Sequence, residues 1–286
     1  MVSAGDMDRM DRMDREKIRL HGAQETMLAT LYGRALDCLS PHPVLGDRVA
    51  VETVRRIDYD FRRTGIGRTD AGGVALRAKQ LDDWTVEFLA GHGWSATVLH
   101  LAAGLDSRVH RIAPPPTVRW MDVDLPEVIA LRERLLPRPT GGDYRAVSAS
   151  VTDSAWLGEV PADRPTVAVF EGLSMYLRKD DGKRLVQRIA GRFPSGQLLF
   201  DSFSTLGIRL QKLVTPVRHA GATLYWGIDD PYELESWHPE LCCLDVLRGV
   251  DLPGVRGLPP LGRVAFRAMS RTPGVRDMGR ILRYAF

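Results

Sequence analysis

The chain has 286 residues, of which 44% are hydrophobic and 26% charged, with a formal net charge of +3. This length suffices for one or two domains with a full α/β core, and the weak charge argues against nucleic acid as a partner. No apolar run of 18 residues and no hydrophobic signal core is present, so we expect no membrane partner and a cytoplasmic protein. The odd cysteine count without metal-ligand spacing predicts reduced thiols and no metal site.

The N-terminal third of the chain has two parts. Residues 1–17 repeat Met-Asp-Arg, which predicts a flexible, charged leader. Residues 18–95 contain three segments with helical periodicity, "ETMLATLYGRALD", "VAVETVRRIDYDF" and "GGVALRAKQLDDWTVEFLA". Three helices before the first strand predict an N-terminal helical cap over a site that is built later in the chain.

Residues 96–286 have the pattern of an α/β domain. Strand-like runs ("TVLHLAA", "VRWMDVD", "YRAVSAS", "TVAVFEG", "QLLFDSF") alternate with helical segments, which predicts a parallel sheet with helices on both faces. Residues 205–240 are rich in aromatic residues, histidine and acids, and we expect an insertion that covers the substrate. "LCCLDVL" and "GRILRYAF" indicate two last strands, the second able to pair antiparallel at or near the edge.

Acidic residues follow most of the predicted strands. In a parallel sheet, ligands bind at the carboxyl ends of the strands, where the strand order reverses. The first strand ends in small residues, and four of the five strand ends carry acid, including Asp122, Asp124, Glu171 and Asp201. Such a site does not suit a phosphate-rich ligand. It suits a ligand with hydroxyls, an amine and a positive charge, such as S-adenosylmethionine.

A set of motifs in order makes this expectation specific. "LHLAAGLDSRVHRI", "WMDVDLPEVIALRERLL", "VSASVTDSAWL" and "FEGLSMYL" follow one another, flanked by "TLYGRALD", "VALRAKQLDDWTVEFL" and "YWGIDDPYELESWHPEL". Over about residues 25–286 the chain resembles the leucine carboxyl methyltransferase family, in particular its bacterial polyketide (tetracenomycin-type) O-methyltransferase branch. The resemblance implies a Rossmann-like class I methyltransferase fold with a mostly parallel seven-stranded sheet. It also implies S-adenosylmethionine as cofactor, bound by the domain of residues 96–286.

The resemblance implies roles for individual residues around the cofactor. The methionine part would lie over Gly104 and Asp106 and within reach of Arg34 and Arg77; the ribose would lie at Asp124 beside Asp122, and the adenine at Ser150 and Val151. Glu171 would be another acid in contact with the cofactor. The chain departs from the family at Ala102, where the family usually has glycine, and at Ser150, where it usually has an acid. Both departures could weaken cofactor binding.

Simpler interpretations of the same residues stay open. Asp124 could cap the helix that begins at "LP", and Glu171 could be a solvated acid at a strand end. Arg34 and Arg77 could be exposed helix arginines, and Asp201 could belong to a turn.

The acceptor is predicted to be a carboxylate of a small secondary metabolite, of the polyketide acid type. A carboxylate is ionised at neutral pH, whereas a phenol with a pKa of about 10 is only ~0.1% ionised at pH 7 and benefits from a base. His219, Tyr225 and His238 are the candidate bases or substrate contacts, and Arg218 could pair with the acceptor.

Other functions remain to be weighed. Phenol or alcohol O-methylation is one alternative, and a methyltransferase-fold protein with a non-methylating or binding function is another. A nucleotide-cofactor oxidoreductase is disfavoured because no full G-x-G-x-x-G is present. A monomer or a homodimer is expected.

Overall fold

The computed structural model describes residues 15–18, 20, 22–140, 142–258 and 260–286. The predicted leader, residues 1–17, therefore lies mostly outside the described residues. Within the described ranges, no helix is long and apolar enough to cross a membrane.

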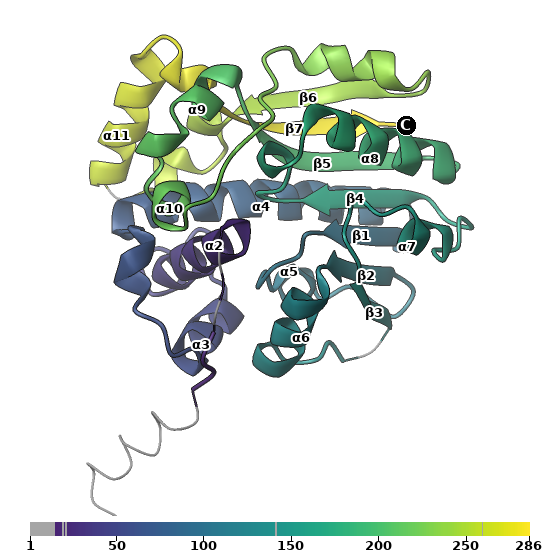
Figure 1. The fold of residues 1–286 in the computed structure, drawn as a ribbon, viewed down its shortest axis with the longest axis horizontal. Helices are drawn as coiled ribbons and strands as arrows, with labels where there is room; N and C mark the ends of the chain where they lie inside the picture. The colour runs from purple at the N-terminus through teal and green to yellow at the C-terminus, as the bar shows by residue number, and fades with distance from the viewer. Residues whose placement is uncertain (1–14, 19, 21, 141, 259) are drawn as a thin grey trace, which may run out of the picture.

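A seven-stranded sheet forms the centre of the molecule, in the order β3-β2-β1-β4-β5-β7-β6 (Figure 1). The first five strands pair in parallel, and β7 runs antiparallel between β5 and β6. This confirms the predicted α/β fold with a mostly parallel sheet. The strands are β1 (Thr97–Leu101), β2 (Arg119–Asp124), β3 (Asp143–Ser148), β4 (Thr166–Phe170), β5 (Gly196–Phe203), β6 (Cys242–Arg248) and β7 (Gly279–Ala285).

Helices cover both faces of the sheet, and for this reason β1, β2 and β4 are buried along their whole length. Successive residues of a strand point to opposite faces. Val98 therefore packs with the layer of α4 (Arg68–Gly91), α5 (Arg108–Ile112) and α11 (Pro260–Arg271). Leu99 and Leu101 pack with the layer of α7 (Ala155–Gly158), α8 (Lys179–Arg192) and the 3-10 helix η4 (Pro231–Trp237).

The three helices predicted before the first strand are present, but they have different positions. α2 (Ala23–Cys38) and α3 (Arg48–Arg56) pack on α6 (Pro126–Leu135) through residues such as Leu28, Ala50 and Leu131. The short η1 (Phe61–Thr64) connects them to α4, whose apolar side chains pack directly on the sheet. α4 is thus a layer of the sandwich, and α2 and α3 are the parts of the cap that extend beyond the sheet.

The segment after β5 also divides into two parts. α9 (Thr205–Arg209), η3 (Gln211–Leu213) and α10 (Thr215–His219) extend beyond the carboxyl ends of the strands. From Trp226 onward the chain returns to the sheet, because the buried side chains of Trp226, Ile228 and Trp237 complete the core beside α8.

Candidate functional site

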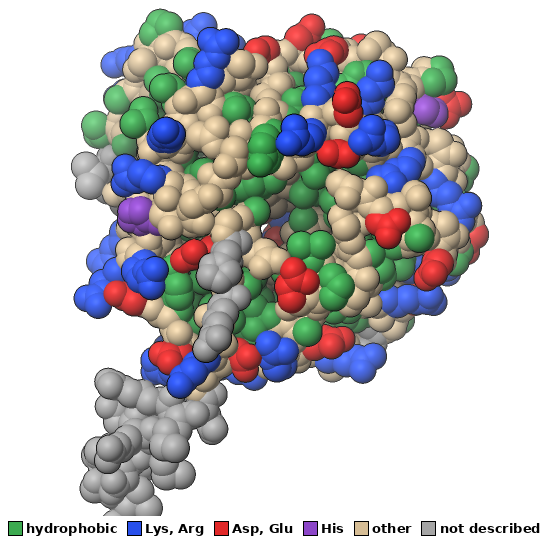
Figure 2. All heavy atoms as spheres, in the orientation of Figure 1, with side chains coloured by type: hydrophobic (Ala, Val, Ile, Leu, Met, Phe, Trp, Pro, Cys, Tyr) green, Lys and Arg blue, Asp and Glu red, His purple; other side chains and the backbone are tan. Residues whose placement is uncertain are grey.

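A cavity of about 370 Å³ lies at the carboxyl ends of the strands, where the strand order reverses between β1 and β4. Figure 2 shows a hollow near the middle of this face, with hydrophobic side chains on its walls. α2 contributes Met27, Thr30 and Arg34 to the lining, and the segment after β5 contributes Val217 and Leu224. The cavity therefore combines residues that are far apart in the sequence.

The turn after β1 forms the floor of the cavity. Ala102 and Gly104 both have positive φ, of 48° and 49°. The Gly104 N–H donates to Asp124 Oδ2 at 2.7 Å, which ties the turn to the end of β2. Ala102 is thus a non-glycine residue in a backbone conformation that glycine adopts most readily. Sequence reasoning expected at Ala102 only an extra methyl group, and the structure adds a strained backbone.

Asp124 lines the cavity and is nearly buried. Its two carboxylate oxygens accept the backbone N–H groups of Gly104 and Leu125, each at 2.7 Å. Burial raises the pKa of the Asp124 carboxyl, against the effect of these two hydrogen bonds. Leu125, and not Asp124, is the residue that precedes the first turn of α6. Each carboxylate oxygen keeps a free lone pair for a ligand hydroxyl.

Asp122 does not line the cavity. It is fully buried and accepts hydrogen bonds from His100 Nδ1 (2.8 Å), Trp120 Nε1 (2.9 Å) and Tyr144 Oη (2.8 Å), as well as from Arg132. Burial alone would raise the pKa of the Asp122 carboxyl, but Arg132 and His100 lower it well below its usual range. Asp122 therefore holds the ends of β1, β2 and α6 together. It was expected to lie beside Asp124 at the cofactor, but only Asp124 lines the cavity.

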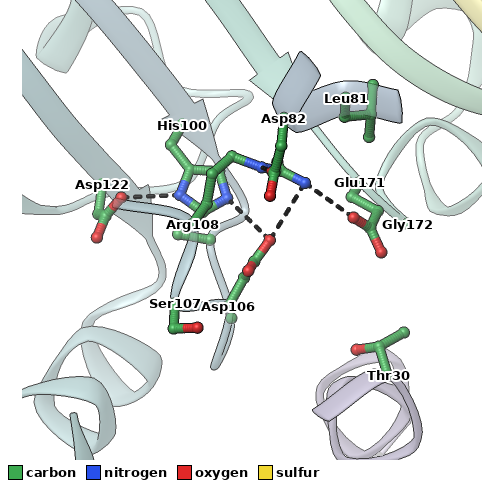
Figure 3. Close-up of polar contacts among 12 residues, drawn as sticks. Thr30, Leu81, Asp82, His100, Asp106, Ser107, Arg108, Asp122, Glu171 and Gly172 are labelled. Carbon is green, nitrogen blue, oxygen red and sulfur yellow. Dashed lines mark hydrogen bonds and ion pairs between the residues drawn. The ribbon is translucent and has the colours of Figure 1, made fainter. Parts of the chain in front are cut away.

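Behind the floor lies a buried network of charged side chains, part of which Figure 3 shows. It contains one more carboxylate than guanidinium, and each member lies within 4.0 Å of an oppositely charged member. The network consists of Arg34, Arg77, Arg108, Arg111, Asp47, Asp82, Asp106, Glu171 and Asp201.

The network fixes the ionisation of two acids that line the cavity. Burial favours the neutral form of both, but Arg111, Arg34 and Arg108 lower the pKa of Asp106 well below its usual range. Arg77 and Arg108 likewise lower the pKa of Glu171. Both acids are therefore carboxylates at neutral pH, and Glu171 is not a solvated strand-end residue.

Three buried polar atoms of this network have no hydrogen-bond partner among the described residues: Arg34 Nε, Arg108 Nη1 and Asp106 Oδ2. Of these residues, Arg34 and Asp106 line the cavity. Arg34 Nε lies 3.5 Å from Asp47 Oδ2, and Asp106 Oδ2 lies 3.4 Å from Arg108 Nη2 and 3.6 Å from His100 Nε2 (Figure 3). Buried donors and acceptors without hydrogen bonds are costly, so this guanidinium and this carboxylate suit a ligand with an anionic and a cationic group.

Ser150 and Val151 line the cavity beyond the end of β3. The Ser150 and Thr152 hydroxyls lie 2.8 Å apart, which keeps the Ser150 side chain within its own turn. Arg188 of α8 donates to the carbonyl oxygens of Val151 and Thr152, at 3.2 and 3.1 Å. This arginine fixes the loop and was not singled out from the sequence.

The four residues proposed to contact the acceptor do not line the cavity. Arg218 and His219 are exposed at the end of α10, and His219 Nδ1 lies 2.6 Å from the Arg63 carbonyl oxygen. Tyr225 is 52% exposed, with the Arg178 guanidinium over its ring. His238 lies beside Gly191, at the end of α8 that is remote from the cavity. The structure thus does not bring these residues together.

Much of the cavity lining is instead apolar. This part includes Ile66, Val74, Met175, Phe203, Val214, Val217 and Leu224, with the Tyr176 hydroxyl donating to Thr26. Burial raises the pKa of Tyr176, so this phenol stays protonated.

Sequence reasoning missed His100, Asp47, Asp82, Arg108 and Arg111. Of these, His100, Arg108 and Arg111 stand within the motif "LHLAAGLDSRVHRI", which is a usable signal. Asp47 directly precedes α3 and Asp82 lies in α4, far from this motif in the sequence, and their pairing with α5 depends on the tertiary fold.

The strand order with its antiparallel β7, and the cavity at the switch point, are those of a Rossmann-like methyltransferase fold. Residues 27–190 match the leucine carboxyl methyltransferase family, and the chain belongs to this family.

The relatives that match most of the chain include two methyltransferases at about 40% identity or more. The tetracenomycin polyketide synthesis O-methyltransferase TcmP of Streptomyces glaucescens is 45% identical over 95% of this chain and 99% of its own length. The S-adenosyl-L-methionine-dependent methyltransferase dpfgK of Gibberella zeae is 39% identical over 80% and 83% of the two chains.

Solved structures share the fold at lower identity. A DUF574-family protein of Streptomyces avermitilis has a TM-score of 0.56 at 14% identity, over 88% of this chain and 96% of its own. A candidate methyltransferase from Thermobifida fusca YX has a TM-score of 0.54 at 17% identity, over 88% and 93%.

Proposed function

We propose that the protein transfers the methyl group of S-adenosylmethionine to a carboxylate oxygen of a small, polyketide-derived acid. The observation that carries the proposal is that a guanidinium and a carboxylate, Arg34 and Asp106, line one cavity and each keep a buried polar atom without a hydrogen bond. The amino-acid end of the cofactor carries a carboxylate and an ammonium, which are the charged groups that such side chains bind.

The remaining contacts follow when the amino-acid end of the cofactor lies at Arg34 and Asp106. Asp124, with a free lone pair on each oxygen, would accept the ribose hydroxyls, and the loop of Ser150 and Val151 would receive the adenine. The surplus carboxylate of the charged network would balance the positive charge of the cofactor. The thiols of Cys38, Cys242 and Cys243 are free, which suits the cytoplasmic location that we also propose.

When bound, the cofactor supplies an electrophilic methyl group on a cationic sulfur. The protein holds donor and acceptor in line and excludes water, and for this reason the apolar half of the cavity is important. The charged network keeps Arg34 and Asp106 in place through Arg111 and Asp47, whose side chains lie 2.9 Å apart.

A carboxylate acceptor agrees best with the lining of the cavity. The candidate bases His219, His238 and Tyr225 lie elsewhere, and Tyr176 stays protonated. His100 is the histidine among the lining residues, and its two nitrogens face Asp122 and Asp106. An acceptor that is ionised in water needs none of these groups as a base.

The test combines binding with product chemistry. Calorimetry should show S-adenosylhomocysteine binding, which Asp106→Asn and Arg34→Met each weaken by about tenfold or more. The methylated product should be an ester that mild alkali cleaves. An alkali-stable ether as the product would show that the acceptor is a phenol and not a carboxylate. No binding of S-adenosylhomocysteine at millimolar concentration would contradict the proposed function as a whole.

A further inference from the structure

His100 is a buried polar residue in the middle of the sheet. It is 1% exposed and stands between Leu99 and Leu101 in β1, a strand that is buried along its whole length. A buried imidazole is costly unless its nitrogens have polar partners. Its two polar contacts, one on each side of the ring, therefore indicate its role.

The Nδ1 side of the ring is fixed to the sheet. Nδ1 donates to Asp122 Oδ1 at 2.8 Å, and Asp122 is itself held by the three further donors described above. The ring also lies edge-on to the Trp120 indole, with the ring centroids 6.2 Å apart. These contacts hold the imidazole in one orientation, in which its Nε2 atom is directed at Asp106 (Figure 3).

The carboxylate of Asp106 is held differently at its two oxygens. Oδ1 accepts a hydrogen bond from Arg111 Nη1 at 2.7 Å. Oδ2 has two cationic or polar neighbours, Arg108 Nη2 at 3.4 Å and His100 Nε2 at 3.6 Å. Arg108 is engaged with two other carboxylates of the network, whereas His100 lines the cavity.

The distance between His100 and Asp106 has a specific meaning. At 3.6 Å, Nε2 is too far from Oδ2 for a hydrogen bond, so Oδ2 stays available to a ligand. It is nevertheless close enough to limit the rotation of the carboxylate. A carboxylate that is oriented before the ligand arrives binds an ammonium group more tightly than one that must first be ordered.

We propose that His100 is a positioning residue for the cofactor, which acts through Asp106 by directing Oδ2 at the ammonium group of the cofactor's amino-acid end. This inference rests on the proposed function and adds a residue to which that function assigns no role. The ring connects the rigid surroundings of Asp122 with the carboxylate that faces the ligand.

Two substitutions separate the two sides of the ring. The side-chain amide of asparagine reaches about the place of Nδ1, and that of glutamine about the place of Nε2. His100→Asn therefore keeps the contact with Asp122 and removes the one with Asp106, and His100→Gln does the reverse. His110→Asn is the matched control, because His110 is a partly buried histidine of α5 outside the cavity lining.

The experiment compares two ligands by calorimetry: S-adenosylhomocysteine and its analogue without the amino group. His100→Asn should weaken the binding of S-adenosylhomocysteine by about tenfold or more, and that of the analogue by less than about threefold. His100→Gln and His110→Asn should keep the wild-type ratio of the two Kd values. In an Asp106→Asn background, His100→Asn should cause no further loss, because it acts through that carboxylate.

A merely structural role of His100 predicts different results. Equal losses for the two ligands in His100→Asn, a changed ratio in His100→Gln, or a further loss in the Asp106→Asn background would each overturn the inference. The urea midpoint of each variant verifies that it is folded. A wild type that does not bind S-adenosylhomocysteine would contradict the proposed function and the inference with it, whereas equal losses would contradict the inference alone.

Discussion

Ala102 is the residue at which the chain departs from its family and from ordinary backbone geometry at once. A left-handed conformation costs an alanine about 1–2 kcal/mol, and glycine avoids this cost. The residue stands in the turn that forms the floor of the cavity, so the strain is located at the candidate site.

We expect Ala102→Gly to raise the free energy of unfolding by about 1 kcal/mol and to strengthen the binding of S-adenosylhomocysteine. Urea denaturation and calorimetry measure the two effects separately. Ala113→Gly is the control: its φ is 47°, and it is exposed at the end of α5 outside the cavity. It should stabilise the fold without changing affinity. Weaker binding of Ala102→Gly would show that the site is adapted to the methyl group.

Asp122 and Asp124 stand two residues apart and should respond differently to substitution. Asp122→Asn leaves the buried Arg132 without its charged partner and should lower the free energy of unfolding by about 3 kcal/mol or more. Asp124→Asn should mainly weaken cofactor binding, because the uncharged amide is a poorer acceptor for ribose hydroxyls. Denaturation curves measure the structural role and calorimetry measures the binding role in both variants. Equal losses of stability in the two variants would contradict this assignment of roles.

The histidines proposed as bases provide a third test at this scale. His219→Ala and His238→Ala should each change the rate of methyl transfer by less than about threefold, far below the 10²–10⁴-fold loss of a general base. Initial rates with a saturating acceptor measure this. A hundredfold loss in either variant would mean that α10 or the loop after η4 reaches the acceptor during turnover.

At the scale of elements, the connection between α2 and α3 depends on one side chain. The buried carboxylate of Asp37 accepts the backbone N–H groups of Val44, Leu45 and Gly46, at 2.9, 2.9 and 3.1 Å. This connection sets the position of α2, which carries Arg34 into the cavity.

Asp37→Ala should therefore lower the free energy of unfolding by about 3 kcal/mol, because three amides lose a charged acceptor. The affinity for S-adenosylhomocysteine should fall as well. Asp70→Ala, which removes the exposed hydrogen bond to the Gly67 N–H before α4, should cost less than about 1 kcal/mol in the same urea titration. An Asp37 variant as stable as the wild type would show that packing alone positions α2.

The elements themselves could be predicted well from the sequence, since strand-helix alternation and buried apolar runs are local signals. The predicted first and last strands, for example, correspond to β1 and β7. The position of α4 was not predictable, because its amphipathic pattern fits a cap and a sheet layer equally. The acceptor residues were not predictable either: an exposed His219 and a ligand-binding histidine have the same sequence pattern.

At the scale of the whole molecule, the acids of the charged network, together with the buried Asp122 and Asp124, should determine the response to acid. The folded state lowers the pKa values of Asp106, Asp122 and Glu171, so these groups bind protons less tightly than in the unfolded chain. Their contribution to stability is present above about pH 4 and is lost as the pH falls. Burial raises the pKa values of Asp124 and Asp201, which act in the opposite direction.

Because the buried acids with lowered pKa values outnumber the buried acids with raised ones, we expect the urea midpoint to fall as the pH drops from about 4 to 3. Glu171→Gln should show a shallower fall, because one of the three groups no longer titrates. A midpoint that stays constant down to pH 3 would contradict this account of the network.

The reversed strand β7 also has a consequence for the way the chain is made. β7 lies between β5 and β6, and its residues follow those of all other strands in the sequence. While the ribosome is still translating, β1 to β5 can pair in turn as they emerge, because each has a neighbour that is already synthesised. β6 has no such neighbour, so its backbone N–H and C=O groups stay unpaired until β7 arrives. The interval before this strand leaves the ribosome is when the nascent protein depends most on chaperones.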